Sequence, residues 1–307
     1  MKTFFVAFSI LSSRNVRLAK KIDAEVIFLK DKFPYIYSTI YTIIKIIRNK
    51  PRNIILQTTQ GPILFIFSIL KKLLKYKLIG DVHSGFIIYL NIKGVALNKP
   101  FLKFLKDLDL IVLHNRQILS FLPFNIRKKC IVIYDPLFNF KEKINIKKGS
   151  NILIFSTIML KPDEPLDVLM LAKNKLNDVA FICTGKKLNS KEIISLGYLK
   201  YEDYLKVMNS SDAVLAMTTR EYTNLSILFE AISLEKCIIA SHTKTLKYIL
   251  QDSALFFKDA DELIACINKL KNENVKHEYE IKIKSLKERL INIELNQIEI
   301  LKRILDK

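Results

Sequence analysis

Residues 53–82 read "NIILQTTQGPILFIFSILKKLLKYKLIGDV", and this stretch decides the fold. It holds a short apolar run at 53–58, a longer apolar run at 62–76 that ends among lysines, and a second short run at 77–82. Short apolar strands separated by a helix are typical of a βαβ unit, whose parallel strands are buried on both faces. The stretch therefore predicts a strand, a crossover helix and a second, parallel strand.

The same alternation continues on both sides of this unit. In the first half we expect further strands and helices at 3–10, 13–22, 24–30, 37–50, near 100–108, 110–115 and 130–135. A polar and basic linker near 139–150 interrupts the pattern, and the alternation then restarts. In the second half the expected elements lie at 151–157, 165–176, 179–185, 201–211, 213–218, 236–241 and 260–272, with a helix that begins near Asn224.

This pattern predicts an α/β protein built from two Rossmann-like, doubly wound parallel-sheet domains that face each other across a cleft. We place the first domain at 1–140, the second at 141–285 and a last helix at 286–307, which could cross back to the first domain. The chain has 307 residues and half of them are hydrophobic, which is enough for two cores of ordinary size.

The charge is divided unevenly between the halves. Residues 1–150 hold 27 Lys and Arg against 8 Asp and Glu, whereas the rest of the chain holds 23 against 22. A difference of this size indicates that the first half faces a polyanion, either anionic lipid, nucleic acid or a phosphorylated substrate. A lysine-rich coding bias is the alternative, although it would raise lysine in both halves.

Several classes of protein are disfavoured by what the sequence lacks. No P-loop, G-x-G-x-x-G, H-E-x-x-H or G-x-S-x-G sequence occurs, which argues against nucleotide hydrolysis, dinucleotide redox chemistry, zinc proteolysis and serine hydrolysis. Cys130, Cys183, Cys237 and Cys266 have no metal-type spacing, so we expect buried free thiols in a reducing cytoplasm. We also expect the first residues to form a buried strand rather than a signal peptide, and no membrane-spanning helix.

Ligands of doubly wound sheets bind beyond the carboxyl ends of the strands, so those positions hold the candidate site residues. In the second half one acid, Glu230, lies within the apolar run "NLSILFEAIS", which is expected to be a helix capped by Thr223 or Asn224. Glu230 is either a solvated helix residue or a functional carboxylate. Helical spacing alone does not decide between the two interpretations.

The segments "GDVHSGF", "VLHNRQ" and "IYDPLF", together with residues 197–241, resemble the GT-B glycosyltransferases, specifically relatives of glycosyltransferase family four. The resemblance covers most of the chain and is most specific in 197–241. It implies a nucleotide-sugar donor held mainly by the second domain and an acceptor held by the first. It also implies catalysis in the interdomain cleft with neither a bound metal nor another cofactor.

The resemblance assigns roles to residues of the second domain. The "FEA" of residues 229–231 occupies the place of a family glutamate that bonds the donor ribose, and an ionised carboxylate suits a vicinal diol. The helix start, at Thr223, Asn224, Leu225 and Ser226, would face the donor pyrophosphate. Gly185 and Lys161 complete the expected donor-binding set, although Lys161 is equally well explained as a surface lysine.

Two departures from the family pattern stand out. The family has a first glutamate eight residues before the second, and this position is Tyr222 here, with Glu221 one residue away. The family's "GKP" reads "EKC" at 235–237. The stereochemical outcome of a transfer therefore stays open.

In the first domain, His83 follows a strand and could hydrogen-bond the sugar or the acceptor hydroxyl as neutral imidazole. Asp81 is the second catalytic candidate, or alternatively an acid that fixes the loop. His114 and Asn115 end a similar strand and are weaker candidates.

A basic face is expected on the first domain and is assigned to an anionic membrane or to the acceptor. Its residues are Arg14, Arg17 and Lys21, at i, i+3 and i+7, Lys71 and Lys75 at i and i+4, and the cations of 127–129. A membrane surface is favoured over nucleic acid, because the sequence carries no recognisable nucleic-acid-binding motif.

These features lead to a hypothesis about function. We expect the protein to be a cytoplasmic hexosyltransferase that is peripherally bound to the inner face of the plasma membrane. It would use a lipid-linked or polysaccharide acceptor in surface glycan biosynthesis. A catalytically silent sugar-nucleotide or polyanion binding protein of the same fold is the alternative.

Overall fold

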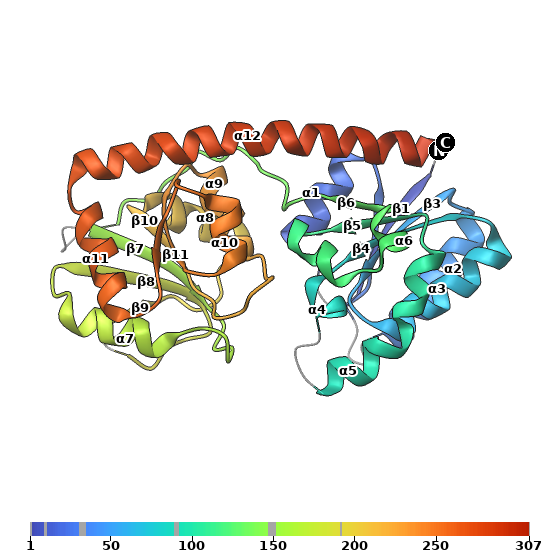
Figure 1. The fold of residues 1–307 in the computed structure, drawn as a ribbon, viewed down its shortest axis with the longest axis horizontal. Helices are drawn as coiled ribbons and strands as arrows, with labels where there is room; N and C mark the ends of the chain where they lie inside the picture. Colours follow the sequence, from blue (N-terminus) through green and yellow to red (C-terminus); the bar gives the residue numbers. More distant parts are fainter. Residues whose placement is uncertain are drawn as a thin grey trace. The chain divides into compact units, whose positions relative to one another are not determined.

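The computed structural model describes residues 2–8, 11–30, 35–88, 92–146, 152–190 and 192–306. The chain divides into two compact units (Figure 1). Unit 1 comprises Met1–Pro136 and Ile293–Lys307, and unit 2 comprises Leu137–Asn292. The division falls four residues before the predicted boundary at 140, and the returning end of the chain starts at Ile293 rather than at residue 286.

Within the described part of unit 1, six parallel strands form one sheet in the order β2-β1-β3-β4-β5-β6. The first strand lies between the second and the third, as in doubly wound sheets of the 2-1-3-4-5 order. The strands are β1 Thr3–Ala7, β2 Glu25–Phe28, β3 Asn53–Thr58, β4 Lys77–Val82, β5 Leu110–Leu113 and β6 Cys130–Val132.

Helices cover both faces of this sheet. The apolar sides of α2 (Ile36–Asn49) and α3 (Gly61–Leu74) pack in one core, and those of α1 (Ser13–Lys21) and the end of α12 (Glu273–Asp306) pack in another. Ser12 and Asn15 cap the start of α1 reciprocally, which fixes where the chain turns after β1. The remaining segments are short: α4 Ser84–Ile87, α5 Ile92–Asn98, η1 Lys99–Asp107, η2 Arg116–Phe121 and α6 Phe124–Arg127.

Unit 2 repeats the architecture. Its described residues form a second parallel sheet of six strands in the order β12-β11-β10-β7-β8-β9. The strands are β7 Ile152–Ile158, β8 Val179–Gly185, β9 Ile194–Ser195, β10 Ala213–Ala216, β11 Cys237–Ser241 and β12 Leu255–Phe257. The helices are α7 Leu166–Lys175, α8 Tyr201–Ser210, α9 Ser226–Ser233, α10 Lys244–Leu250 and α11 Ala260–Leu270.

The last helix, α12 (Glu273–Asp306), contributes to both units. In unit 2, the Lys287 ammonium donates to the Ser233 carbonyl (2.9 Å) and to the Glu235 carboxylate (2.8 Å). In unit 1, the Leu305 carbonyl accepts from the Asn53 amide (3.0 Å) and the Ile304 carbonyl from Lys77 (2.9 Å). The helix begins well before residue 286, where the sequence pattern had placed it.

Most predicted elements are confirmed, and three of the predicted strands match residue for residue: 53–58, 77–82 and 179–185. The expected helix near 100–108 is instead the 3₁₀ helix η1, which starts at Lys99 with Pro100 in its first turn. The short elements α4, α5, α6, α10, η2, β9 and β12 were not predicted. They are too short to show a clear hydrophobic period.

The cysteines are free thiols, as expected, with Cys183, Cys237 and Cys266 buried and Cys130 partly buried. Burial raises the pKa of the Cys237 thiol to about 12. No helix in the described residues combines the length and the apolar character needed to cross a membrane.

Candidate functional site

The central residue of the candidate site in unit 2 is Glu230 on α9. This helix is apolar on nearly all sides and every residue of 227–233 is buried, so Glu230 is carried into the interior and is only 4% exposed. A buried carboxylate is costly unless it is hydrogen-bonded. The Tyr201 hydroxyl donates to its Oε1 (3.0 Å) and the Tyr204 hydroxyl to its Oε2 (2.7 Å). The interpretation of Glu230 as a solvated helix residue is therefore wrong.

The two tyrosines come from the first turn of α8 and act as a pair. Their rings stack with centroids 5.9 Å apart, and Thr157 lies within hydrogen-bond distance of the Tyr204 hydroxyl (3.4 Å). Burial, reinforced by the nearby Glu230 charge, raises the pKa of Tyr204 well above its ordinary value. Tyr204 is therefore a permanent hydroxyl donor near neutral pH.

Two adjacent cavities open beside these residues, both within unit 2. The first, the Glu230 cavity, has a volume of about 260 Å³, and its lining includes Glu230, Gly185, Thr184, Tyr198 and Tyr201. The second, the α9 cavity, has a volume of about 300 Å³, and its lining includes Lys161, Asp163, Arg220 and residues 223–227. They share Thr157, Met159 and Tyr204. The structure thus brings all seven predicted donor-binding residues to one region: Glu230, Thr223, Asn224, Leu225, Ser226, Gly185 and Lys161.

Gly185 ends β8 at the edge of the Glu230 cavity. Its φ of +99° lies in the left-handed region that favours glycine, and a Cβ built there would lie 2.2 Å from the Ile158 carbonyl oxygen. This position therefore admits only glycine, which keeps the ends of β7 and β8 close together.

The start of α9 differs from the prediction. The helix begins at Ser226 with Leu225 at the capping position, and no described side chain caps it. Thr223 and Asn224 lie in the preceding loop, so neither is the cap that the sequence pattern suggested. Both still line the α9 cavity.

Arg220 was missed by the sequence analysis. It follows β10 and lies in the lining of the α9 cavity with Lys161, and its guanidinium pairs with the Asp163 carboxylate (3.3 Å). Asp163 is held in turn, because its other oxygen accepts from the Thr218 hydroxyl (3.0 Å) and its carbonyl from the Thr219 N–H (2.7 Å). The sequence signal for Arg220 is its position two residues after the apolar run "AVLAMT" at 213–218, at the carboxyl edge of the sheet.

Glu221, next to Arg220, has a structural role. Both of its carboxylate oxygens accept from the Lys244 N–H (2.9 and 3.2 Å) at the start of α10. Tyr222, at the place of the family's first glutamate, has a positive φ of 60°. Glu221 therefore does not take the place of the family's first glutamate, because its carboxylate is already bound to the N–H group at the start of α10.

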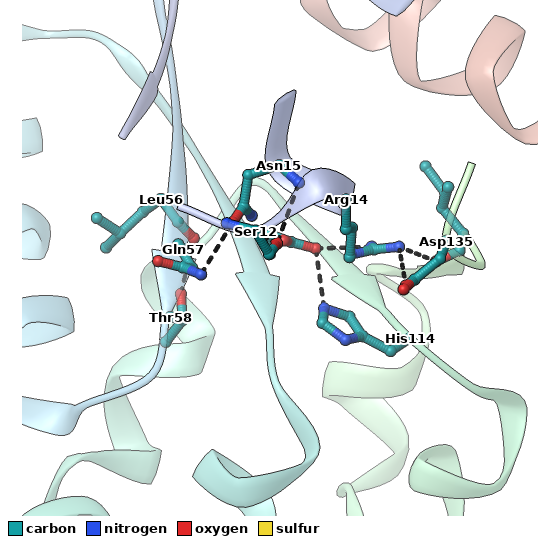
Figure 2. A network of polar contacts seen from close by, with 10 residues as sticks. Ser12, Arg14, Asn15, Leu56, Gln57, Thr58, His114 and Asp135 are labelled. Carbon is teal, nitrogen blue, oxygen red and sulfur yellow. Dashed lines mark hydrogen bonds and ion pairs between the residues drawn. The ribbon is translucent and has the colours of Figure 1, made fainter. Parts of the chain in front are cut away.

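In unit 1 the predicted residues form a buried polar network around Arg14 (Figure 2). Arg14 on α1 is 2% exposed, and its guanidinium donates to Asp81 Oδ1 (2.9 Å), to Asp135 Oδ1 (3.3 Å) and to the Ile133 carbonyl (2.9 Å). His114 Nε2 lies 3.2 Å from the same Asp81 oxygen. Arg14 therefore cannot belong to an exposed basic face, which corrects the sequence prediction.

The other members of the expected basic face are more accessible but partly engaged. Arg17 donates to the Ser13 hydroxyl (3.2 Å), and Lys21 pairs with Glu294 of α12. Lys71 pairs with Asp109 (2.8 Å), while Lys75 is exposed at the end of α3. The stripe predicted on α1 is thus not a continuous row of available cations.

His83 follows β4 and lies beside this network. Its ring centroid is 4.3 Å from that of His114, and its Nε2 is buried without a hydrogen-bond partner. Burial and the neighbouring His114 lower the pKa of His83 to about 3, although Asp81 acts in the opposite direction. At Asp81, burial alone would raise the pKa, but Arg14 and His114 more than offset it, and the pKa lies well below its usual range.

Asp81, His83 and His114 together offer three possible metal-ligand atoms within 4.8 Å of one another. Arg14, however, already donates to the Asp81 carboxylate, so a metal ion there would meet a guanidinium charge across a single carboxylate. The arrangement fits a hydrogen-bonded polar network built on Arg14 better than a metal centre. The expected absence of a metal requirement stays a prediction.

Residues 167–288 match the family described as "Glycosyl transferase-like". No curated protein matches the chain. Among solved structures, the Anabaena protein HepE in complex with UDP-glucose superposes with a TM-score of 0.74 at 13% identity, covering 99% of this chain and 100% of that one. Sucrose-phosphate synthase from Thermosynechococcus elongatus superposes with a TM-score of 0.76 at 12% identity, covering 100% of both chains.

The chain has the GT-B fold. A glycosyltransferase from Rickettsia africae shares it, with a TM-score of 0.66 at 13% identity over 99% of this chain and 98% of that one. The resemblance inferred from the sequence is confirmed for the fold and for the glycosyl transferase-like segment. That segment holds Glu230, Arg220 and both tyrosines, whereas β7 and Lys161 lie before it. The matched segment lies entirely within unit 2.

Proposed function

We propose that the protein is a glycosyltransferase that moves a sugar from a UDP-sugar, held by unit 2, to an acceptor held by unit 1. The observation that carries this proposal is Glu230, a buried carboxylate that lines a cavity and accepts hydrogen bonds from two neutral hydroxyls. A ribose presents the same kind of donor, two neighbouring hydroxyls, and could replace the tyrosines at the carboxylate without leaving it unpaired.

The neighbouring α9 cavity suits the diphosphate. Lys161 and Arg220 bring two positive charges to its lining, which also holds Asp163 and Glu164. Both carboxylates are engaged, Asp163 by Arg220 and Glu164 by the Met159 and Lys161 N–H groups, and the N-terminal end of α9 adds the favourable end of a helix dipole. Guanidinium groups bind phosphate oxygens in a forked geometry, and Arg220 is 34% exposed at its side chain and thus accessible. Tyr198 and Tyr201 line the first cavity and offer aromatic faces for the base.

The solved relatives support the choice of donor. HepE is described in complex with UDP-glucose, with UDP and glucose, and with UDP. HepE is only 12–14% identical to this chain in these structures, so its ligands give secondary support. The main support for the proposal is the chemistry of the two cavities. We further propose a hexosyl transfer without a metal ion, in which Lys161 and Arg220 neutralise the leaving diphosphate.

In unit 1, His83 is proposed to contact the transferred sugar or the acceptor hydroxyl. A histidine with a pKa of about 3 is neutral in the cell, so it acts as a hydrogen-bond partner and does not supply a cation. Asp81 is proposed to hold the loop through Arg14 and His114, which makes it a positioning residue.

We propose that the acceptor is a lipid-linked or surface glycan and that the protein works at the inner face of the plasma membrane. The charge excess of residues 1–150 supports this, as does an exposed apolar stripe on α2 formed by Ile36, Ile40, Ile44 and Ile47. An exposed apolar stripe beside lysines is typical of a helix that lies on an anionic bilayer. Cosedimentation with anionic vesicles should fall as salt rises, and equal binding to neutral vesicles would contradict an electrostatic contribution.

A thermal unfolding screen tests the donor. UDP-sugars and UDP should raise the unfolding midpoint, because a ligand at a hundred times its dissociation constant adds about 2.7 kcal/mol of stability. Release of UDP in the presence of extracted membrane lipids then separates the enzyme from the silent binding protein. Stabilisation without turnover would favour the silent alternative, which the missing first glutamate keeps open. No response to any nucleoside diphosphate would refute both the glycosyltransferase and a silent sugar-nucleotide binding protein, and would favour a polyanion-binding protein.

A further inference from the structure

Unit 1 contains a cavity that the proposed chemistry does not use. Its volume is about 560 Å³, within the range of small-molecule sites, and it lies among η1, η2, α6 and the end of α4. Its apolar lining residues include Ile87, Leu102, Leu105, Phe121, Leu122 and Ile126. We refer to it as the η1–α6 cavity.

The local sequence explains why this region stays open. Each surrounding segment is a 3₁₀ helix or a single helical turn, and Pro123 separates η2 from α6. Such short elements cannot interdigitate as two long helices do. Leu105, Leu122 and Ile126 belong to the core of unit 1, so the apolar wall of the cavity continues the core outward.

The lining of the cavity is both aromatic and basic. Phe121 of η2 lines it and is 46% exposed. Phe124, between the lining residues Pro123 and Asn125 in the sequence, is 70% exposed, and the Lys128 ammonium lies 4.8 Å from its ring centroid. Lys103 and Lys106 belong to the lining itself, and among the described lining residues none is acidic. Exposed aromatic rings with adjacent lysines are characteristic of surfaces where an apolar layer meets anionic headgroups.

We infer that the η1–α6 cavity binds the hydrocarbon chain of a phosphate-bearing lipid, with Lys103 and Lys106 contacting the phosphate. An apolar wall alone would suit any hydrophobe, but the two lysines at the same cavity select an anionic amphiphile. Resting on the proposed function, this lipid is the acceptor class for the transfer. Ile87 in the cavity wall ends α4, and His83 stands at the start of the same four-residue helix. A single helical turn therefore connects the cavity proposed to bind the hydrocarbon chain with His83, which is proposed to contact the sugar or the acceptor hydroxyl.

The probe for this inference is dodecyl phosphate below its micelle concentration, added to the full chain and followed by titration calorimetry. Dodecanol, which has the chain without the charge, and inorganic phosphate, which has the charge without the chain, are the matched controls. We expect saturable binding of dodecyl phosphate, with binding at least about tenfold weaker for either control because each lacks one half of the recognition.

Two variants locate the binding. Lys103→Glu with Lys106→Glu changes exposed residues and should weaken dodecyl phosphate binding by about tenfold or more, because both cations near the phosphate are replaced by anions. Leu102→Trp should weaken it by filling the cavity. The charge-matched control, Lys20→Glu on α1 with Lys72→Glu on α3, changes two exposed lysines outside the lining and should leave the affinity unchanged.

The outcomes separate the cavity from the proposed function. Absent binding, equal binding of dodecanol, full affinity in the Lys103 and Lys106 double variant, or displacement of dodecyl phosphate by UDP would each overturn the inference. UDP-sugar turnover is measured on the same variants with a water-soluble sugar acceptor. Turnover without dodecyl phosphate binding leaves the glycosyltransferase proposal intact and rejects the lipid site. Lipid binding at this cavity by a protein that neither binds nor uses UDP-sugars would reject the proposed function instead.

Discussion

Asp81 in unit 1 and Glu230 in unit 2 are both buried carboxylates, but their partners differ in kind. Asp81 faces a guanidinium and an imidazole, at 2.9 Å from Arg14 and 3.2 Å from His114. Glu230 accepts from the hydroxyls of Tyr201 and Tyr204 and also lines a cavity. The first carboxylate is paired with a charge, and the second is hydrogen-bonded by neutral groups.

This difference indicates which carboxylate a ligand can use. A sugar hydroxyl and a tyrosine hydroxyl are both neutral and each donates one hydrogen bond. Exchanging one for the other at Glu230 therefore costs little free energy. No neutral ligand group matches the guanidinium at Asp81, and displacing Arg14 would leave two charges buried without compensation. We therefore assign Asp81 to the stability of unit 1 and Glu230 to ligand binding.

The largest effect is expected from breaking the charged pair. Arg14→Met should destabilise unit 1 by about 3–5 kcal/mol, because Asp81 and Asp135 would stay buried without their cation. Urea unfolding of the variant measures the loss. Arg14→Met combined with Asp81→Asn should be less destabilised than Arg14→Met alone, and equal losses would show that Arg14 acts through packing rather than charge.

Glu230→Gln tests the other side of the comparison. The fold should survive, because an amide keeps one acceptor for a tyrosine hydroxyl, but UDP affinity should fall by about 1.5–3 kcal/mol through lost charge-assisted bonds. Calorimetric titration of UDP against both proteins measures this change. Wild-type affinity in the variant would mean that Glu230 only anchors α8 to α9.

The neutral state of His83 predicts a pH dependence of stability. Its pKa in the folded chain is about 3, below the ordinary value, so between those two pH values the unfolded chain binds a proton that the folded chain does not. Stability should therefore fall as pH drops below about 6.5, by about 2 kcal/mol at pH 5 from this group alone. His83→Gln should flatten the urea-unfolding profile between pH 5 and 7.5. An unchanged slope would show that His83 gains its proton in the folded state.

The two sheets could be predicted from the sequence because parallel strands that are buried on both faces appear as short, continuous runs of apolar residues. The sequence was not sufficient for Arg14, since helical spacing places Arg14, Arg17 and Lys21 on one side of α1 without revealing which of them reaches the interior. The answer depends on Asp81 and Asp135, which lie 67 and 121 residues further along the chain. Pairings over such separations are set by the fold and leave no local pattern.

The site in unit 2 shows the same limit on a smaller scale. The resemblance located Glu230, but its tyrosine partners lie 29 and 26 residues before it, on a different helix, and were not identified. Arg220 was not identified from the sequence, whereas Lys161, in the loop after β7, was. In the folded chain that loop and the loop after β10 line one cavity, so a cation from either can serve it.

Arg220 gives the smallest expected effect and separates the two halves of the donor site. Arg220→Gln should weaken UDP by about 1 kcal/mol, a modest loss because the guanidinium is partly exposed and its charge is screened by water. Uridine carries no phosphate, so its affinity should be unchanged in this variant, whereas Glu230→Gln should weaken uridine and UDP alike through the shared ribose. Lys269→Gln on α11, outside both cavities, is the charge-matched control. Parallel titrations of uridine and UDP decide the assignment, and an Arg220→Gln variant that loses uridine affinity would place the ribose, rather than the diphosphate, beside the Arg220–Asp163 pair.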